Sequence, residues 1–504
     1  YMPNCPETII TMLATSALGA VFSSCSTDFG VSGVLDRFKQ IEPKILVTVD
    51  GYLYNGKRID RHNEVHEIVN GLETLEKTVV LKYLDESKNV KYSFKFDYFE
   101  TVYFSVPIKK FASVNFNDPL YIVFSSGTTG APKCIVHGVG GVLLQHAKEH
   151  KLHANIKEGD KVFYFSTCGW MMWNWLVGSL FSKATIILYE GSPFFEGPMK
   201  LWDLAENENI TLFGTSAKYI DALRKSGYRP NLNKKLNHLK CLCSTGSPLS
   251  PEGFQFISQH IKSDMQIGSI SGGTDILSCF VLNNPLDDVV SGEIQGIGLG
   301  MSVEVFDHNG VSITDEPGEL VCTKPFPSMP IMFWNDPDGK KYRDAYFNYY
   351  PNIWRHGDWT KITERGTLII YGRSDATLNP GGVRIGTAEI YKVVENFDEV
   401  FESIVVGQEW EDDIRVILFV KLNDGSVLNQ DLISKIKNTL KTQVSPRHVP
   451  AKIISIKDIP RTRSGKITEL AVRDIIHGKE IKNSEALSNP EALELYKNLT
   501  ELKN

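Results

Sequence analysis

Hydrophobic and polar residues alternate along the chain with spacings that indicate a layered α/β core. Small and apolar residues recur at helical spacing over residues 8–20, and a short β-branched apolar run follows at 45–49. The same order returns later, with a buried strand expected at 119–124, a helix at 140–153 and a strand at 184–189. Apolar strands that alternate with amphipathic helices favour a sheet covered by helices.

The pattern changes twice toward the C-terminus. Between about residues 292 and 368, short strands are separated by turns rich in Asp, Asn and Gly, which predicts a β-rich subdomain. After Asp375 the order of elements restarts. The elements expected there are a helix near 387–396, strands near 404 and 416–420, and a helix at 431–442.

This order predicts two domains. A large N-terminal domain of layered α/β subdomains plus the β-rich subdomain is expected over residues 1–374, and a small mobile α+β C-terminal domain over 375–504. A chain of 504 residues, 42% hydrophobic and 23% charged, is typical of a globular protein with more than one core. The first residue is Tyr1 rather than methionine, which suggests a piece of a longer protein.

Charge and hydropathy argue against two classes of partner. The net charge is -6 and basic residues are dispersed, so the chain lacks the field that general nucleic-acid binding requires. It contains no run of eighteen apolar residues, which argues against a membrane span. The eight cysteines lack the spacing of a zinc ribbon or a thioredoxin motif and are interpreted as reduced thiols. A cytosolic, cytoplasmic protein is expected.

The strongest local signal directly follows the apolar strand at 119–124. It reads Ser125-Ser126-Gly127-Thr128-Thr129-Gly130-Ala131-Pro132-Lys133. Glycines let backbone N–H groups approach anionic oxygens, hydroxyls add donors, and Lys133 adds a full charge. The stretch lacks the Gly-Lys-Ser/Thr ending of a P-loop. A polar turn would explain glycine and serine but not this combination, so the sequence predicts contact with polyphosphate.

This stretch resembles the phosphate-binding signature of the adenylate-forming superfamily, which includes acyl-CoA synthetases, luciferases and peptide-synthetase adenylation domains. The superfamily's other signatures follow in order as Ser271-Gly272-Gly273-Thr274-Asp275, His356-Gly357-Asp358, Tyr371-Gly372-Arg373-Ser374-Asp375 and Pro460-Arg461-Thr462-Arg463-Ser464-Gly465-Lys466. The resemblance implies an enzyme that converts a carboxylic acid and ATP to an acyl-AMP and pyrophosphate.

A closer resemblance, through residues 168–175, 268–275 and 378–380, is to the acetoacetate-activating acyl-CoA synthetases. It implies acetoacetate, ATP and coenzyme A as substrates, with Mg²⁺; those relatives have an additional N-terminal segment. The alternatives are a CoA ligase for another short or branched acid, an adenylation module that loads a carrier protein, and a catalytically silent nucleotide-binding fragment. The tail after Lys466 shows no carrier domain, and the charges expected of an active enzyme are present.

The resemblance also assigns roles to residues. Lys466 is the expected catalytic charge, because a carboxylate and an α-phosphate repel each other unless a fixed positive charge lies between them. Asp358 is expected to bind the ribose hydroxyls and Asp275 to help hold Mg²⁺. The residues expected to contact ATP or AMP are Ser125, Ser126, Gly127, Thr128, Thr129, Lys133, Gly246, Ser247, Pro248, Ser271, Gly272, Gly273, Thr274, Asp358, Arg373 and Arg384.

Rotation of the C-terminal domain about Asp375 is implied for the second half-reaction, because it would withdraw Lys466 and admit coenzyme A. Gly381 and Gly382 would then leave room for the narrow pantetheine arm. Lys57, Arg58 and Arg61 are expected to meet the CoA phosphates, although basic residues in a polar loop are also typical of a solvated surface.

The acyl pocket is expected to be formed by Trp170, Met171, Met172 and Gly272. Acetate-activating relatives carry tryptophan at the position of Gly272, so glycine would open space for a longer acid, and each methylene alters selectivity by roughly 1–3 kcal/mol. Core packing is the alternative for this apolar stretch. Asn174 or a tryptophan N–H is a candidate donor to the ketone.

Three histidines, His146, His150 and His153, fall on one face of an expected helix and are a weaker candidate for a metal site.

Overall fold

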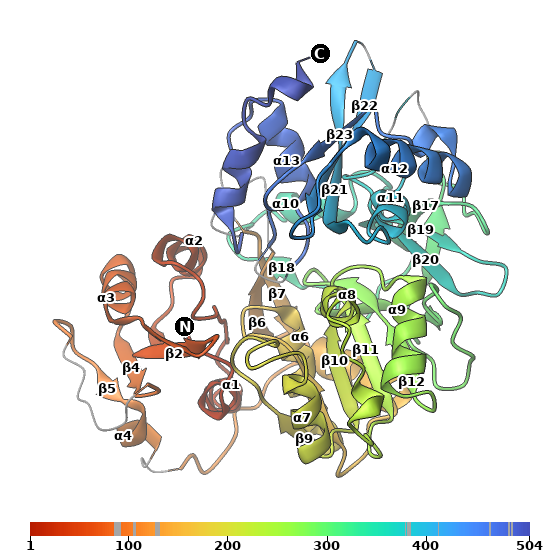
Figure 1. Cartoon of the computed structure of the whole chain (residues 1–504). Helices are drawn as coiled ribbons and strands as arrows, with labels where there is room; N and C mark the ends of the chain where they lie inside the picture. The colour runs from red at the N-terminus through yellow and green to blue at the C-terminus, as the bar shows by residue number, and fades with distance from the viewer. Residues whose placement is uncertain are drawn as a thin grey trace.

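The computed structural model describes residues 1–84, 92–103, 107–125, 132–378, 380, 385–411, 413–462, 465–481, 484 and 487–503. Two lobes of a large N-terminal domain lie side by side beneath a small C-terminal domain (Figure 1). The first lobe is drawn in red and orange, the second in yellow and green, and the C-terminal domain in blue. In the part of the chain that is described, no helix is both long and apolar enough to cross a membrane.

The first lobe is built on a parallel sheet of order β1-β4-β5. Its elements are α1 (Pro6–Ala17), α2 (Val31–Ile41), β1 (Ile45–Val49), β2 (Gly51–Tyr54), β3 (Lys57–Asp60), α3 (His62–Gly71), β4 (Lys77–Leu81), β5 (Asp97–Tyr98) and α4 (Phe99–Tyr103). Helices α2 and α3 carry apolar residues at helical spacing and bury them against the sheet, with Val34, Val65 and Ile68 in one core. The hairpin β2–β3 lies outside this sheet.

The second lobe contains a five-stranded parallel sheet of order β12-β11-β10-β8-β9. Its strands are β8 (Lys161–Tyr164), β9 (Thr185–Ile187), β10 (Leu212–Ser216), β11 (Cys241–Thr245) and β12 (Gln266–Ser269). Its helices are α5 (Val139–Lys148), α6 (Met171–Gly178), α7 (Lys200–Asn207), α8 (Ala217–Lys225) and α9 (Pro251–Phe256). Because all five strands are parallel, the segments that follow them open at one edge of the sheet, where ligands bind in open α/β folds.

Three antiparallel sheets complete the N-terminal domain. Strands β6 (Pro119–Phe124), β7 (Cys134–Gly138) and β18 (Met332–Phe333) form one, and β13 (Ser271–Gly273), β14 (Ser278–Leu282) and β15 (Gly296–Ile297) form another. The third contains β16 (Val303–Phe306), β17 (Gly318–Cys322), β19 (Trp354–Ile362) and β20 (Leu368–Arg373), with α10 (Lys340–Tyr346) packed nearby. Their shared core includes Phe280, Trp354 and Leu368.

The C-terminal domain is a three-stranded sheet with helices packed against it. Its elements are α11 (Thr387–Val394), β21 (Val400–Trp410), β22 (Asp413–Leu422), α12 (Gln430–Gln443), β23 (Lys452–Ser455) and α13 (Glu469–Ile476), followed by a 3₁₀ segment (Pro490–Tyr496). Strand β22 lies in the middle, antiparallel to β21 and parallel to β23. Two buried apolar clusters, one including Ile404 and Phe419 and one including Val405 and Leu418, cover opposite faces of the sheet.

The predicted α/β fold class with a β-rich subdomain and a smaller α+β domain is confirmed. The helix expected at 140–153 is α5 continued by a π-helical turn (Glu149–His153), and the strand expected at 184–189 is the shorter β9. Asp375 lies just after β20, in the short turn that leads toward the C-terminal domain.

Candidate active site

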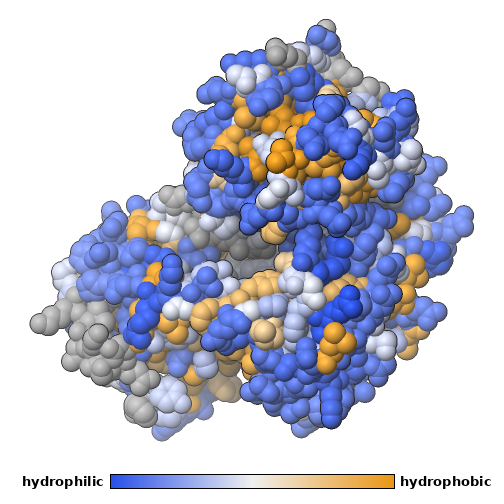
Figure 2. Space-filling model, viewed as in Figure 1, coloured by the Kyte–Doolittle hydropathy of each residue, from blue (hydrophilic) through white to orange (hydrophobic). Residues whose placement is uncertain are grey.

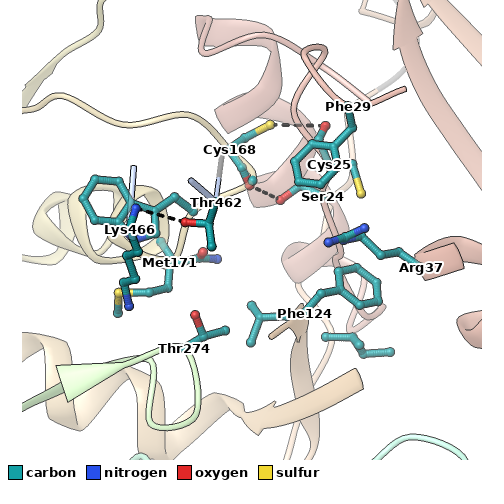
Figure 3. Close-up of a pocket in the computed structure, with 15 residues that line it drawn as sticks. Ser24, Cys25, Phe29, Arg37, Phe124, Cys168, Met171, Thr274, Thr462 and Lys466 are labelled. Carbon is teal, nitrogen blue, oxygen red and sulfur yellow. Dashed lines mark hydrogen bonds between the residues drawn. The ribbon is translucent and has the colours of Figure 1, made fainter. Parts of the chain in front are cut away.

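A pocket lies where the two lobes and the C-terminal domain meet. The space-filling view shows a hollow between the C-terminal domain and the lobes below it (Figure 2). Side chains from both domains converge on the pocket, including Met171, Thr274 and Lys466 (Figure 3). The residues that line it are Ser24, Cys25, Phe29, Arg37, Ile122, Val123, Phe124, Cys168, Gly169, Trp170, Met171, Asn174, Thr274, Thr462 and Lys466.

Lys466 reaches the pocket from a tight turn of the C-terminal domain. Thr462 N donates to Lys466 O at 2.8 Å, and Lys466 N donates to Thr462 Oγ1 at 3.0 Å. Gly465 has φ +82°, a left-handed conformation that glycine adopts without steric cost. Surrounding protein lowers the pKa of Lys466 through desolvation and then through Arg373, although Asp358 and Asp275 act in the opposite direction. The Lys466 side chain is exposed and lines the pocket.

Asp358 and Arg373 face each other on adjacent strands. Their Cα atoms are partners in the antiparallel register of β19 and β20, and Arg373 Nη1 lies 3.1 Å from Asp358 Oδ1. Arg373 also donates to His356 O at 3.2 Å, and its Nε lies 3.6 Å from Asp375 Oδ1. The arginine therefore joins the predicted ribose-binding carboxylate to the predicted hinge.

Thr274 and Asp275 lie at the turn after β13. The neutral ring of His137 lies between two carbonyl oxygens, 3.3 Å from Thr274 O and 3.2 Å from Ser328 O, and burial lowers its pKa to about 4. Burial alone would raise the pKa of Asp275, but Lys133, with Nζ 3.9 Å from Oδ1, and a hydrogen bond from Tyr346 Oη lower it overall. Asp275 is thus an ionised carboxylate facing a lysine.

The predicted phosphate loop connects β6 and β7, which are antiparallel strands. Ser125 and Lys133 close its base, because Ser125 N donates to Lys133 O at 3.2 Å and Lys133 N donates to Ser125 Oγ at 3.1 Å. Ser126, Gly127, Thr128 and Thr129 lie outside the described residues. Lys133 extends toward Asp275 and lies over the ring of Tyr346, 5.5 Å from its centroid.

The residues predicted to border adenine follow strand β11. Gly246, with φ +90°, Ser247 and Pro248 stand at the carboxyl edge of the parallel sheet. A Cβ on Gly246 would lie 3.9 Å from both Ser216, the last residue of β10, and Trp170, which follows β8. The structure therefore brings the predicted adenine residues next to a wall of the pocket.

The expected acyl residues separate into two groups. Trp170 and Met171 line the pocket, whereas Met172 is buried in the core of the second lobe. Gly272 is not part of the pocket lining, and a Cβ there would fall 2.0 Å from Ser278 O and 2.6 Å from Cys279 Cα. Strand β14 lies against Gly272 in this structure, and the room that this glycine is expected to open for a longer acid stays a prediction.

The predicted CoA residues lie on the first lobe. Lys57 and Arg58 are exposed on β3, and Arg58 donates to Leu84 O. Arg61 instead has structural partners: Nη1 contacts Glu64 Oε1 at 2.6 Å and Nε donates to Thr27 O at 3.0 Å. Gly381, Gly382 and Arg384 lie outside the described residues.

The three histidines on α5 and the π-helical turn are buried and contact other parts of the protein. His146 Nε2 lies 2.8 Å from Leu277 O, and His153 Nδ1 lies 2.8 Å from Asn283 O. His150 is buried against Trp175. No group of three or more metal-ligating side chains is found among the described residues, so a metal site at these histidines has no support.

Sequence reasoning missed Ser24, Arg37 and Thr462. Ser24 donates to Cys168 O at 2.6 Å and so joins the two lobes at the pocket. Arg37 lies on α2 between Val34 and Phe38, and its guanidinium stacks 4.5 Å from the centroid of Phe29. An arginine on the apolar face of an amphipathic helix is a signal that could have identified it. Thr462 belongs to the signature quoted at 460–466, but no role was assigned to it.

Comparison with known proteins agrees with this geometry. A family model described as AMP-binding enzyme matches residues 1–330, and one described as AMP-binding enzyme C-terminal domain matches residues 389–466. An acetoacetyl-coenzyme A synthetase of Rhizobium meliloti (strain 1021) is 56% identical over 100% of this chain and 78% of the relative. An acetoacetyl-CoA synthetase of Xenopus tropicalis is 46% identical over 100% of this chain and 76% of the relative.

Solved structures agree as well. The structure of an acetoacetyl-CoA synthetase from Streptomyces lividans superposes with a TM-score of 0.94 at 42% identity, covering 100% of this chain and 77% of that chain. An anthranilate CoA ligase in complex with anthranoyl-AMP shares the fold alone, with a TM-score of 0.78 at 18% identity over 92% of this chain and 84% of that chain. With both family models matched in order and relatives this similar over its full length, the chain belongs to the AMP-binding enzyme family, among the acetoacetyl-CoA synthetases.

Proposed function

We propose that this chain joins acetoacetate to coenzyme A at the expense of ATP, with acetoacetyl-AMP as the intermediate. The observation that carries the proposal is the meeting of Lys466, from the C-terminal domain, with Trp170, Met171 and Thr274, from the N-terminal domain, in one pocket. Family membership supports the reaction, and the names of the relatives support the acid.

In the first half-reaction, a carboxylate oxygen of acetoacetate attacks the α-phosphorus of ATP. The bond from that phosphorus to the bridging oxygen breaks, and pyrophosphate leaves with the electron pair. Both reactants are anions, so a positioned cation lowers the barrier by stabilising the charge that develops between them. Lys466 is the cation that supplies this charge, because its turn directs the ammonium into the pocket.

The N-terminal domain holds the nucleotide. Asp358 is placed to accept hydrogen bonds from the ribose hydroxyls, with Arg373 fixing its orientation at 3.1 Å. Ser125 and Lys133 anchor the loop that receives the phosphates. Gly246, Ser247 and Pro248 border the adenine, at the carboxyl edge of the parallel sheet.

Asp275 fits a role in holding Mg²⁺. It is a carboxylate whose pKa is lowered despite burial, with Lys133 as its nearest cation. Mg²⁺ in nucleotide sites is commonly held by one or two carboxylates together with phosphate oxygens and water, so a single aspartate suits this purpose. The ion would neutralise part of the charge on the phosphates. Such a site forms only when ATP contributes oxygens.

In the second half-reaction, the CoA thiol attacks the acyl carbon of acetoacetyl-AMP. The bond from carbon to the AMP oxygen breaks, AMP leaves, and the thiol proton passes to solvent. Lys466 stands in the pocket in this structure, so the C-terminal domain must rotate about Asp375 before CoA can take its place. Gly381 and Gly382 are proposed to border the pantetheine arm, with Lys57 and Arg58 near the CoA phosphates.

The proposal is tested by acid-dependent release of AMP from ATP in the presence of Mg²⁺ and CoA. Acetoacetate is compared with acetate, butyrate and longer acids at equal concentrations. We expect the highest kcat/KM with acetoacetate. A higher value with another acid would reassign the substrate, and acid-independent background with every acid would contradict the reaction itself.

A further inference from the structure

Helix α8 of the second lobe directs two lysines toward the C-terminal domain. Lys218 and Lys225 are seven residues apart, a spacing of two turns that places them on one helix face. Lys218 Nζ lies 3.3 Å from Glu395 Oε2 and 3.1 Å from Glu402 Oε1. Lys225 Nζ donates to the carbonyl oxygens of Val400 and Phe401. These acceptors lie at the end of α11 and on β21, so α8 is a docking element for the smaller domain.

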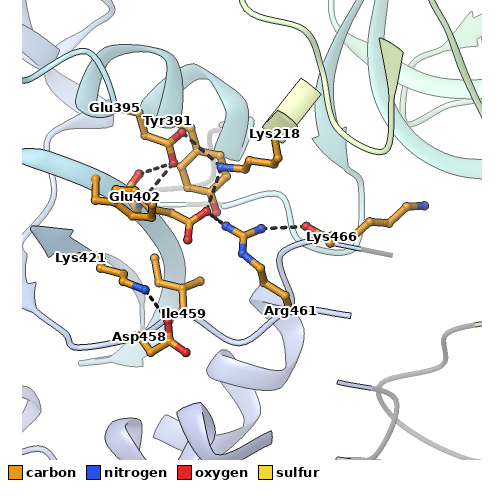
Figure 4. Close-up of polar contacts among 12 residues, drawn as sticks. Lys218, Tyr391, Glu395, Glu402, Lys421, Asp458, Ile459, Arg461 and Lys466 are labelled. Carbon is orange, nitrogen blue, oxygen red and sulfur yellow. Dashed lines mark hydrogen bonds and ion pairs between the residues drawn. The ribbon is translucent and has the colours of Figure 1, made fainter. Parts of the chain in front are cut away.

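The carboxylate of Glu402 connects this docking helix to the turn that carries Lys466. Its side chain is 8% exposed and forms an ion pair with Arg461 as well as with Lys218. Arg461 Nη1 in turn donates to the carbonyl oxygen of Gly465 at 2.8 Å, one residue before Lys466. Figure 4 shows this chain of contacts running from Lys218 through Glu402 and Arg461 to Lys466.

A rotation of the C-terminal domain would break some of these contacts and keep others. Glu402, Arg461 and Gly465 all belong to the C-terminal domain and would move together. Glu395 moves with them, because its Oε1 accepts hydrogen bonds from Ser403 N at 3.0 Å and from Ser403 Oγ at 3.2 Å. Lys218 belongs to the N-terminal domain. Rotation about Asp375 would therefore break the contacts of Lys218 and leave the others intact.

An interaction that exists in one of two conformations shifts the population toward that conformation. The pairs made by Lys218 accompany the arrangement in which Lys466 lines the pocket. The Lys218 side chain is 26% exposed and Glu402 is nearly buried, so solvent screens this pair less than it screens a fully exposed one.

From this geometry we infer that Lys218 is a positioning residue for acyl-AMP formation: it holds the C-terminal domain, through Glu402 and Glu395, in the arrangement that presents Lys466. The inference rests on the proposed function, in which Lys466 serves the first half-reaction. Lys218 does not line the pocket. It acts through Glu402 and Arg461, and its pairs must break before the thioester step.

The test separates the two half-reactions in Lys218→Met, which removes the charge and keeps the length of the side chain. Acyl-AMP formation is measured as acetoacetate-dependent exchange of pyrophosphate into ATP, and thioester formation as CoA consumption with supplied acetoacetyl-AMP. We expect exchange to fall about 5- to 20-fold while thioester formation is unchanged or faster. Lys218→Arg should retain exchange. Lys225→Met should show the same split with a smaller loss.

Lys234→Met is the matched control. Lys234 also bridges two carboxylates, Asp203 at 2.6 Å and Glu206 at 3.3 Å, and its side chain is 17% exposed, but both partners lie in its own lobe. Neither half-reaction should change in this variant. Thermal unfolding of each variant identifies any that fails to fold.

Two results would overturn the inference in folded Lys218→Met: an equal loss in both half-reactions, or undiminished exchange. A wild-type chain without acetoacetate-dependent exchange would instead contradict the proposed substrate. The role of Lys218 is then judged by the same split with whichever acid supports exchange, and a chain that exchanges with no acid contradicts both proposals.

Discussion

The two sides of the pocket are built in different ways. On the N-terminal side, Asp358 and Arg373 are fixed as register partners of adjacent strands, and the residues proposed to border adenine follow a strand of the parallel sheet. On the C-terminal side, Lys466 stands on a turn of a separate domain and lines the pocket. The proposed nucleotide side is therefore part of the sheet framework, and the proposed catalytic charge comes from a separate domain. This difference suits the proposed reaction, in which Lys466 acts in the first step and not in the second.

The largest effect is expected for Lys466, on the C-terminal side of the pocket. Lys466→Ala should lower acetoacetate-dependent pyrophosphate exchange by about 10²–10³-fold, because one preorganised charge at a developing anion has this effect on rate. Thioester formation from supplied acetoacetyl-AMP should be retained. An equal loss in both half-reactions would mean that Lys466 does not distinguish them and would remove the contrast between the two sides.

The next largest effect is expected for Asp358, on the N-terminal side of the pocket. Asp358→Asn keeps the shape and removes the charge that pairs with Arg373 and is proposed to bind the ribose hydroxyls. We expect kcat/KM for ATP to fall roughly 10- to 100-fold in exchange, since hydrogen bonds to charged groups contribute about 1.5–3 kcal/mol. Binding of AMP, measured by calorimetry, should weaken in parallel. Unchanged AMP affinity would refute the role of Asp358 at the ribose.

A smaller effect is expected at the acyl end of the pocket. Asn174 is a buried amide among the apolar residues that line it, and a ketone placed there needs a donor. Asn174→Leu should lower the preference for acetoacetate over butyrate roughly 2- to 10-fold, the effect of one neutral hydrogen bond. The ratio of kcat/KM values for the two acids measures it. A preserved ratio would assign the ketone to another donor.

The smallest expected effect is on pH dependence. Lys466 must be protonated to act as a cation, and its pKa is lowered from the ordinary value of 10.5. Activity is therefore full below the lowered pKa and is lost as pH rises through it. The alkaline limb of pyrophosphate exchange should lie below that of an ordinary lysine, while thioester formation from supplied acyl-AMP should lack this limb. The same alkaline limb in both half-reactions would point to a different group.

The fold followed from local patterns. The strands at 45–49 and 119–124 are apolar runs of the length that a buried strand needs, and both are strands in the structure. The signature residues Thr274, Asp358, Arg373 and Lys466 come from segments far apart in the sequence, and the structure gathers them near one pocket. The resemblance of their segments to the superfamily's motifs was enough to predict them as site residues.

Features that depend on long-range contact could not be predicted in this way. Gly272 looked like a space-making substitution, but the strand that lies against it is set by the β13–β14 register, which no local pattern gives. Lys218 looks like any helix lysine, and its partners Glu395 and Glu402 are more than 170 residues away. Their pairing requires two domains to dock.

The distance in sequence between residues that line the pocket also limits when activity can begin during synthesis of the chain. Ser24 and Lys466 line the same pocket, although more than 400 residues separate them. At about 5–20 residues per second, the ribosome reaches Lys466 roughly 20–90 s after Ser24. The residues of the N-terminal domain that line the pocket are synthesised in that interval, but the pocket gains Lys466 only after the C-terminal domain has emerged and docked. Translation of the domain that carries Lys466 thus determines when the pocket is first complete.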